Sequence, residues 1–99
     1  MKLYKLINGI AETALEDMEI SGITDNTSKV REGFIFVCVR GASFDGHSAA
    51  ERMLEKGAAL VVAEYDLGLG DRQIITENSR EFYGRLCAAW FLSLIHISE

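Results

Sequence analysis

Two spacings of apolar residues divide the chain into predicted strands and helices. Residues 34–39 and 58–63 are continuous apolar runs without a polar face, which is typical of central strands covered on both sides. Residues 19–24 and 73–76 are shorter or more polar, and we expect two further strands there. Helical spacing recurs at Leu3, Leu6, Ile7 and Ile10, at Ala49, Ala50, Met53 and Leu54, and at Phe82, Leu86 and Ala89.

Short polar patterns predict where two of these helices begin and end. Ser48 is followed three residues later by Glu51, the pattern of a capping box, so we expect a helix to start at Ser48. Gly57 suits the position just past the end of that helix. Asn78 and Glu81 repeat the capping pattern before the last helix.

The order of these elements predicts the fold. Residues 34–63 read as strand, helix and strand, a βαβ unit whose two strands run parallel. Gly22 interrupts the first strand and indicates a bulge or a close backbone contact. We therefore expect an α/β fold, a three-layer domain with a central mixed sheet between helices. A chain of 99 residues buries enough surface for one core only.

Composition and charge exclude several classes of protein. Fifteen acidic and ten basic residues give a net charge of −5, which argues against a nucleic-acid binder with its basic footprint. The amino terminus has neither the apolar segment nor the cleavage site of a signal peptide. No stretch approaches the ~20 apolar residues of a membrane helix, so we expect no membrane insertion and a cytoplasmic location.

Cysteine and histidine positions predict no metal site or nucleophile. Cys38 and Cys87 fall within apolar patterns and are expected to be buried thiols rather than a disulfide. His47 and His96 have no carboxylate or second histidine at metal-ligand spacing. We expect the Asp45 loop, with His47, to shape the entry to the following helix rather than to act as an acid–base pair.

A polar turn at residues 25–28 is the main candidate for binding. Such side chains bond their own backbone, so a plain turn is one interpretation. A hydroxyl beside two short polar side chains also suits hydrogen bonding to a pyrimidine or a ribose. Lys29, Arg31 and Arg40 are each expected at the surface, and together they are a hypothesis for attracting a diphosphate. The sequence has no GxxxxGK[ST] loop for ATP.

Several segments together resemble the N-terminal domain of the Mur ligases, and the MurE type in particular. The ISGIT stretch at residues 20–24 and the stretch at residues 78–91 favour that type, and the resemblance covers residues 1–91. Residues 92–99 depart from the family pattern and are expected to be a truncation or an out-of-frame end. The segments that carry the resemblance are Ile23-Thr24-Asp25-Asn26-Thr27, Lys29-Val30-Arg31-Glu32-Gly33, Ile35-Phe36-Val37 with Gly41, Asp45-Gly46-His47 and Lys56-Gly57-Ala58.

The resemblance implies a site for UDP. The family's Asp-Ser-Arg turn falls on Asn26, Thr27 and Ser28, so Thr27 keeps a substrate-contacting hydroxyl while Ser28 lacks the arginine charge. Asp25 takes the place of a residue that contacts the nucleotide through its backbone. A second contact segment follows the second strand, where Phe44 packs either on the uracil or in the core. The implied UDP-binding residues are Asp25, Asn26, Thr27, Ala42, Ser43 and Phe44.

The resemblance also implies what lies outside this chain. The full-length family enzyme uses ATP and magnesium to make an amide bond on UDP-N-acetylmuramoyl-L-alanyl-D-glutamate, and its central and C-terminal domains are absent here. We expect this fragment to bind the substrate without catalysis and to hold neither ATP nor magnesium. The added residue, diaminopimelate or lysine, is not determined. The alternatives are a MurF-type ligase domain and a stand-alone, non-catalytic nucleotide-binding module.

Overall fold

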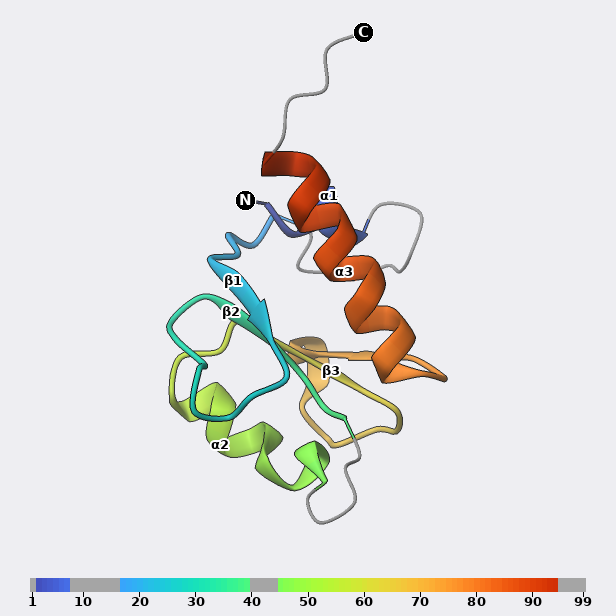
Figure 1. Cartoon of the computed structure of the whole chain (residues 1–99). Coiled ribbons are helices and arrows are strands. Elements are labelled where there is room, and N and C mark those ends of the chain that lie inside the picture. Colours follow the sequence, from blue (N-terminus) through green and yellow to red (C-terminus); the bar gives the residue numbers. More distant parts are fainter. Residues whose placement is uncertain (1, 8–16, 40–44, 95–99) are drawn as a thin grey trace, which may run out of the picture.

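A four-stranded sheet forms the middle of the domain (Figure 1). The computed structural model describes residues 2–7, 17–39 and 45–94. The sheet consists of β1 (Gly22–Thr24), β2 (Phe34–Val37), β3 (Leu60–Ala63) and β4 (Gln73–Ile75), in the order β1-β2-β3-β4. All neighbouring pairs are parallel. The four carboxyl ends therefore lie at one edge of the sheet, which we call the carboxyl edge.

Helices cover both faces of this sheet. The helices α1 (Leu3–Ile7) and α3 (Ser79–Leu94) pack against each other on one face, and α2 (Ala50–Glu55) lies on the other (Figure 1). Two short 3-10 turns, Gly46–Ala49 and Gly70–Arg72, precede α2 and β4. The predicted three-layer α/β architecture is confirmed. No helix in the described part of the chain is long and apolar enough to cross a membrane.

The two central strands bury both rows of their side chains. Ile35 of β2 and Leu60 of β3 belong to the core beneath α1 and α3, whereas Phe36 belongs to the core beneath α2. None of these three side chains is exposed. Each such burial stabilises the fold by about 1.5–3 kcal/mol, because apolar surface leaves water. Burial on both faces explains why residues 34–39 and 58–63 are apolar at every position.

The sheet differs from the prediction in direction and in strand length. It is parallel throughout its described strands and not mixed, since residues 25–33, 38–59 and 64–72 each return the chain to the opposite edge before the next strand begins. An isolated antiparallel bridge joins Lys2 and Glu19 outside the sheet. Strand pairing covers 22–24 and 34–37, less than the predicted 19–24 and 34–39.

The predicted capping box at Ser48 is wrong, and Asp45 takes over its role. The Asp45 carboxylate accepts from the backbone N–H of His47 at 3.0 Å, while the Ser48 hydroxyl donates to the Asp45 carbonyl at 2.8 Å. A 3-10 turn thus comes first, and α2 begins only at Ala50. The prediction for Gly57 is confirmed, because its φ of +115° belongs to the left-handed region that favours glycine.

Glycine at position 22 makes room for an aromatic ring. A Cβ on Gly22 would lie 2.6 Å from the Phe34 ring on the neighbouring strand. The predicted close contact is therefore with a side chain, and no bulge occurs in the β1–β2 register. At the other end of the fold, α3 continues to Leu94. Ile10 and residues 95–99 lie outside the described residues.

Candidate functional site

The carboxyl edge is the natural place to look for a binding site, because open α/β sheets bind ligands beyond the carboxyl ends of their strands. The segments that leave this edge start with Asp25 after β1, Cys38 after β2, Glu64 after β3 and Thr76 after β4. The amino end of α3 also lies here, since only residues 76–78 separate it from β4. Three loops and one helix end thus converge on this edge.

The turn after β1 is held rigid by its own side chains. The Thr24 hydroxyl accepts from the backbone N–H of Asn26 at 3.1 Å. The Asn26 side-chain oxygen accepts from the backbone N–H of Ser28 at 2.9 Å and from its hydroxyl at 2.7 Å. Lys56 donates to the Thr27 carbonyl at 2.9 Å and ties the turn to the end of α2. The Asn26 side chain therefore shapes the turn, as the plain-turn interpretation predicts.

The predicted site residues divide into two groups. Asp25 and Asn26 are exposed and Thr27 is half-buried, and all three lie in the turn after β1. Ala42, Ser43 and Phe44 lie outside the described residues. The structure therefore brings the first group together at the carboxyl edge.

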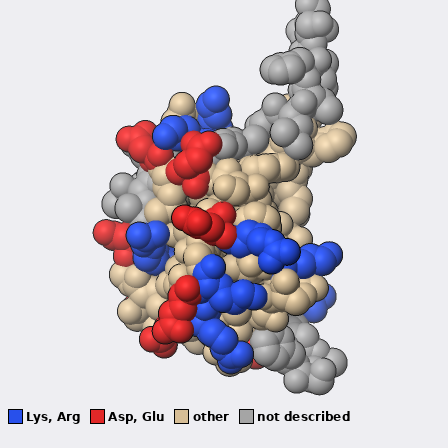
Figure 2. Space-filling model, turned by 90° about the vertical axis from the view of Figure 1, so that its left-hand side faces the viewer, with Lys and Arg blue, Asp and Glu red and all other residues tan. Residues whose placement is uncertain are grey.

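Of the three predicted cations, Arg31 lies away from this turn. The Arg31 carbonyl accepts from the backbone N–H of Phe34 at 3.2 Å, which places Arg31 at the start of β2, at the opposite edge. Lys29 is exposed and follows the turn, and Arg40 lies outside the described residues. Figure 2 shows basic side chains interspersed with acidic ones on the face that it displays. Arg31 is thus not placed to meet a diphosphate at the carboxyl edge.

His47 is the most constrained polar side chain near this edge. Its side chain is 1% exposed, and its Nδ1 lies 2.6 Å from Oδ1 of Asp45. Its Nε2 accepts from the backbone N–H of Glu64 at 2.9 Å, so the proton of the neutral ring is on Nδ1. The ring of Tyr65 stacks on it, with centroids 4.4 Å apart and planes 13° apart. His47 therefore joins the start of α2 to the end of β3, a structural role like the one predicted.

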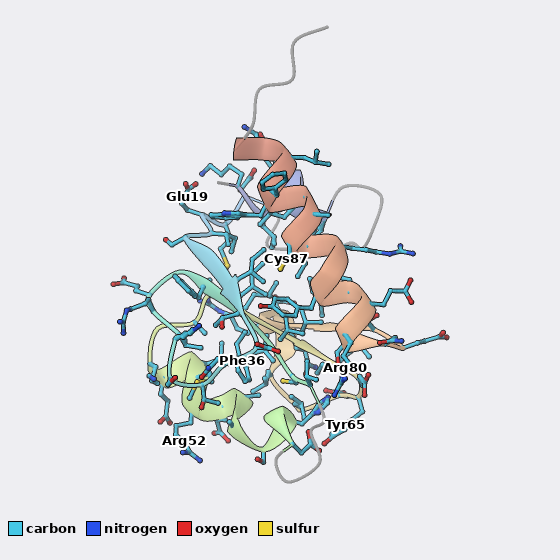
Figure 3. The ribbon with its side chains drawn as sticks, in the orientation of Figure 1. Glu19, Phe36, Arg52, Tyr65, Arg80 and Cys87 are labelled. Carbon is cyan, nitrogen blue, oxygen red and sulfur yellow. The ribbon has the colours of Figure 1, made fainter. Side chains whose placement is uncertain are left out.

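Glu64 and Asn78 fix the amino end of α3 at the same edge. The Glu64 carboxylate accepts from the backbone N–H of Ser79 at 3.0 Å and from its hydroxyl at 3.2 Å. The side chain of Asn78 accepts from the backbone N–H of Glu81 at 3.1 Å, which confirms its predicted capping role. Figure 3 shows Tyr65 and Arg80 at this end of the molecule. The Glu64 carboxylate thus already accepts from the N–H and the hydroxyl of Ser79, which an anionic ligand would otherwise use.

Two α3 residues that the sequence did not assign to a site, Tyr83 and Cys87, approach the turn after β1. Tyr83 lies close enough to Cys87 and to Asp25 for their charges to act on it. Burial raises the pKa of Tyr83, and the neighbouring Cys87 and Asp25 raise it further. Partial desolvation of the thiol also raises the pKa of Cys87. The residue as a whole is exposed, so the prediction that Cys87 is buried is wrong. The spacing of Tyr83 and Cys87, one helical turn apart, was the available signal.

A hollow of about 420 Å³ lies at the opposite edge of the sheet, away from the predicted residues. Its wall includes Glu32, Lys56, Gly57 and Arg72. Arg72 donates to the Ala59 carbonyl at 3.0 Å, and Lys56 is bonded to the turn after β1. Both cations thus already bond backbone carbonyls, and we do not assign a ligand to this hollow.

The described residues form no recognisable site for ATP or magnesium. The sequence has no phosphate loop, and the described residues contain no group of three His, Cys, Asp or Glu side chains placed to hold a metal ion. His96 lies outside the described residues.

Comparison with known proteins identifies relatives that match up to 92% of this chain. Residues 19–90 match the family model described as "Mur ligase family, catalytic domain". A UDP-N-acetylmuramoyl-L-alanyl-D-glutamate–2,6-diaminopimelate ligase from Bacillus velezensis is 34% identical over 95 residues, which is 92% of this chain and 19% of the relative. The ligase of the same name from Phocaeicola vulgatus is 42% identical over 67 residues, 65% of this chain and 14% of the relative.

Solved structures of similar fold come from the same family. A MurF ligase from Thermotoga maritima in complex with ADP matches 79% of this chain and 18% of its own, with a TM-score of 0.65 and 31% identity. A MurF from Acinetobacter baumannii matches 89% of this chain and 20% of its own, with a TM-score of 0.74 and 18% identity, which bears on the fold alone. The chain spans about a fifth of the length of these relatives. By these matches, the chain belongs to the Mur ligase family and corresponds to its N-terminal domain.

Proposed function

We propose that this chain is the domain that holds the UDP part of UDP-N-acetylmuramoyl-L-alanyl-D-glutamate in an ATP-dependent ligase of the MurE type. The observation that carries the proposal is the 34% identity to a 2,6-diaminopimelate ligase over 92% of the chain. That relative's name specifies the acceptor substrate. The proposed ligase makes a cytoplasmic precursor of peptidoglycan.

The carboxyl edge supports a recognition role for this domain. The turn that carries Asp25, Asn26 and Thr27 is held by internal hydrogen bonds before any ligand arrives, which reduces the entropy lost on binding. In the proposed site the Thr27 hydroxyl bonds the uridine, Asp25 contributes its backbone, and Asn26 keeps the turn in shape. Ala42, Ser43 and Phe44 complete the proposed site from the loop after β2.

The chemistry of the proposed ligase belongs to the part of the family enzyme that this chain does not span. There, ATP activates the substrate carboxylate, with magnesium, and an amine then attacks to give the amide. The described residues contain no group of three His, Cys, Asp or Glu side chains that could hold a metal ion. We therefore expect this chain to bind the substrate and not to catalyse, and its partners are that substrate and the remaining domains of the ligase.

Titration of the chain with UDP and with ADP tests the proposal. We expect UDP to bind more tightly, and equal or absent binding of the two would contradict a uridine site. Thr27→Val removes the hydroxyl at nearly constant shape and should weaken UDP binding about 3- to 10-fold, the loss of roughly 1 kcal/mol. Thr27→Ser keeps the hydroxyl and is the matched control.

A MurF-type ligase is the second candidate, because a MurF from Thermotoga maritima is 31% identical over 79% of this chain. The two types differ in the group that they add. Supplying a full-length ligase that contains this chain with ATP and, separately, with diaminopimelate, lysine or D-alanyl-D-alanine distinguishes them. Turnover with the dipeptide alone would replace the MurE assignment while leaving the UDP site intact.

A further inference from the structure

Tyr65 presents an aromatic ring at the carboxyl edge. It follows Glu64 at the end of β3 and is 42% exposed. The other large apolar side chains of comparable exposure are Tyr4 in α1, Ile75 in β4, and Phe91 and Leu92 in α3. Among these exposed residues of the described part, Tyr65 alone is an aromatic residue placed just beyond a strand's carboxyl end.

The Tyr65 ring is oriented by the immobile ring beneath it. His47 is held from both sides, by Asp45 and by the backbone N–H of Glu64, and its side chain is 1% exposed. Tyr65 stacks on this ring with centroids 4.4 Å apart and planes 13° apart, at the short end of aromatic stacking distances. Because the orientation exists before binding, a planar ligand that stacks here loses little additional side-chain entropy.

The negative charge near Tyr65 favours contact with the base of a nucleotide over contact with its phosphates. The Asp45 side chain, which bonds the His47 ring, is 42% exposed. This carboxylate disfavours a diphosphate beside the stacked rings, whereas a neutral pyrimidine is not repelled. Resting on the proposed UDP site, we propose that Tyr65 is a substrate-binding residue on which the uracil ring stacks.

A purely structural role for Tyr65 makes different predictions. In that case the ring only shields the bond between His47 and the Glu64 N–H from water, and its loss lowers stability without changing which base is bound. Stacking instead predicts sensitivity to the aromatic character of the base itself. The two roles are therefore separated by changing the ligand as well as the residue.

The experiment measures binding of UDP and of 5,6-dihydro-UDP, whose base keeps its polar groups but is neither planar nor aromatic. Base stacking on an aromatic side chain is worth about 1–3 kcal/mol, so Tyr65→Leu should weaken UDP binding roughly 5- to 150-fold. Tyr65→Phe keeps the ring and should bind UDP nearly as the unchanged chain does. Tyr4→Leu is the matched control, because Tyr4 is equally exposed, at 44%, but lies on α1.

The unchanged chain should prefer UDP to dihydro-UDP, and Tyr65→Leu should lose most of that preference. The uracil H5 and H6 proton signals of bound UDP should move upfield on the unchanged chain because of the ring current, a test that needs no variant. Unchanged UDP affinity in folded Tyr65→Leu, or absent upfield shifts, would overturn the role of Tyr65 while the UDP site stands. A failure of the unchanged chain to bind UDP would overturn both proposals.

Discussion

Substitution of His47 gives a graded test of the hydrogen bonds that join α2 to β3. Asparagine keeps a donor near the position of Nδ1 and leaves the Glu64 N–H without its acceptor, which costs about 1–3 kcal/mol in a partly buried place. Glutamine keeps an acceptor near the position of Nε2 and loses the bond to Asp45. Since the Asp45 side chain is 42% exposed, water replaces this bond and the cost is about 0.5–1.5 kcal/mol. His47→Ala loses both bonds and the stacked ring, about 2–4 kcal/mol.

Urea unfolding followed by the fluorescence of Trp90 measures these differences. Trp90 is the single tryptophan and is half-buried against the core under α3, so its signal reports global unfolding. We expect the free energy of unfolding to fall in the order His47→Gln, His47→Asn, His47→Ala, with an unchanged denaturant slope. Ser48→Ala is the control, with an expected loss below about 0.5 kcal/mol, because its exposed hydroxyl caps no helix. A larger loss for glutamine than for asparagine would refute the assignment of the proton to Nδ1.

Two further predictions concern stability. Burial raises the pKa of Cys38 to about 12, from an ordinary value of 9.0, with a smaller effect of Asp45. Above pH 9 the unfolded chain loses this thiol proton while the folded chain keeps it, so the free energy of unfolding should decrease between pH 9 and 12. Cys38→Ala should show a shallower decrease, and an equal slope in the two proteins would contradict this account. Gly57→Ala should destabilise by about 1–3 kcal/mol in chemical denaturation, since φ is +115° and the new Cβ would lie 3.0 Å from the Glu32 Cα. Gly68→Ala, at φ +74° with open space around it, should cost less, and an equal loss at both sites would show that the close contact is irrelevant.

Much of the fold was predictable because the central strands are buried on both faces. Phe36 and Val61 lie under α2 while Ile35 and Leu60 lie under α1 and α3, and this leaves an apolar run that local sequence reveals. The strand ends were less predictable. Hydrogen-bonded pairing stops where the neighbouring strand ends, and the local sequence of one strand does not show where its neighbour ends. Whether neighbouring strands run parallel or antiparallel also depended on the path of each connection between strands, and the spacing of apolar residues does not encode that path.

The candidate site was predictable only in part. The turn at residues 25–28 was visible from its polar residues, and the resemblance to the Mur ligases selected it as a uridine contact. The sequence indicated that the side chains of this turn can bond its own backbone, as Asn26 does with Ser28, but it did not indicate that Arg31 lies at the opposite edge. It also gave no reason to expect a contact between the rings of Tyr65 and His47, which are 18 positions apart. The two residues meet because β3 pairs with β2 in the sheet.

The sequence by itself determined the elements, the three-layer class and the family. Burial on two faces produces continuous apolar runs, and the turn residues recur at fixed spacing, so both are visible in short stretches of sequence. The tertiary structure decided which polar groups share the carboxyl edge, since parallel strands bring there the ends of segments far apart in the chain. It also decided which of those groups are already bonded to each other: His47 to Asp45 and Glu64, and Glu64 to Ser79. Hydrogen-bond partners follow from distance in space, and that distance is set only when the sheet is assembled.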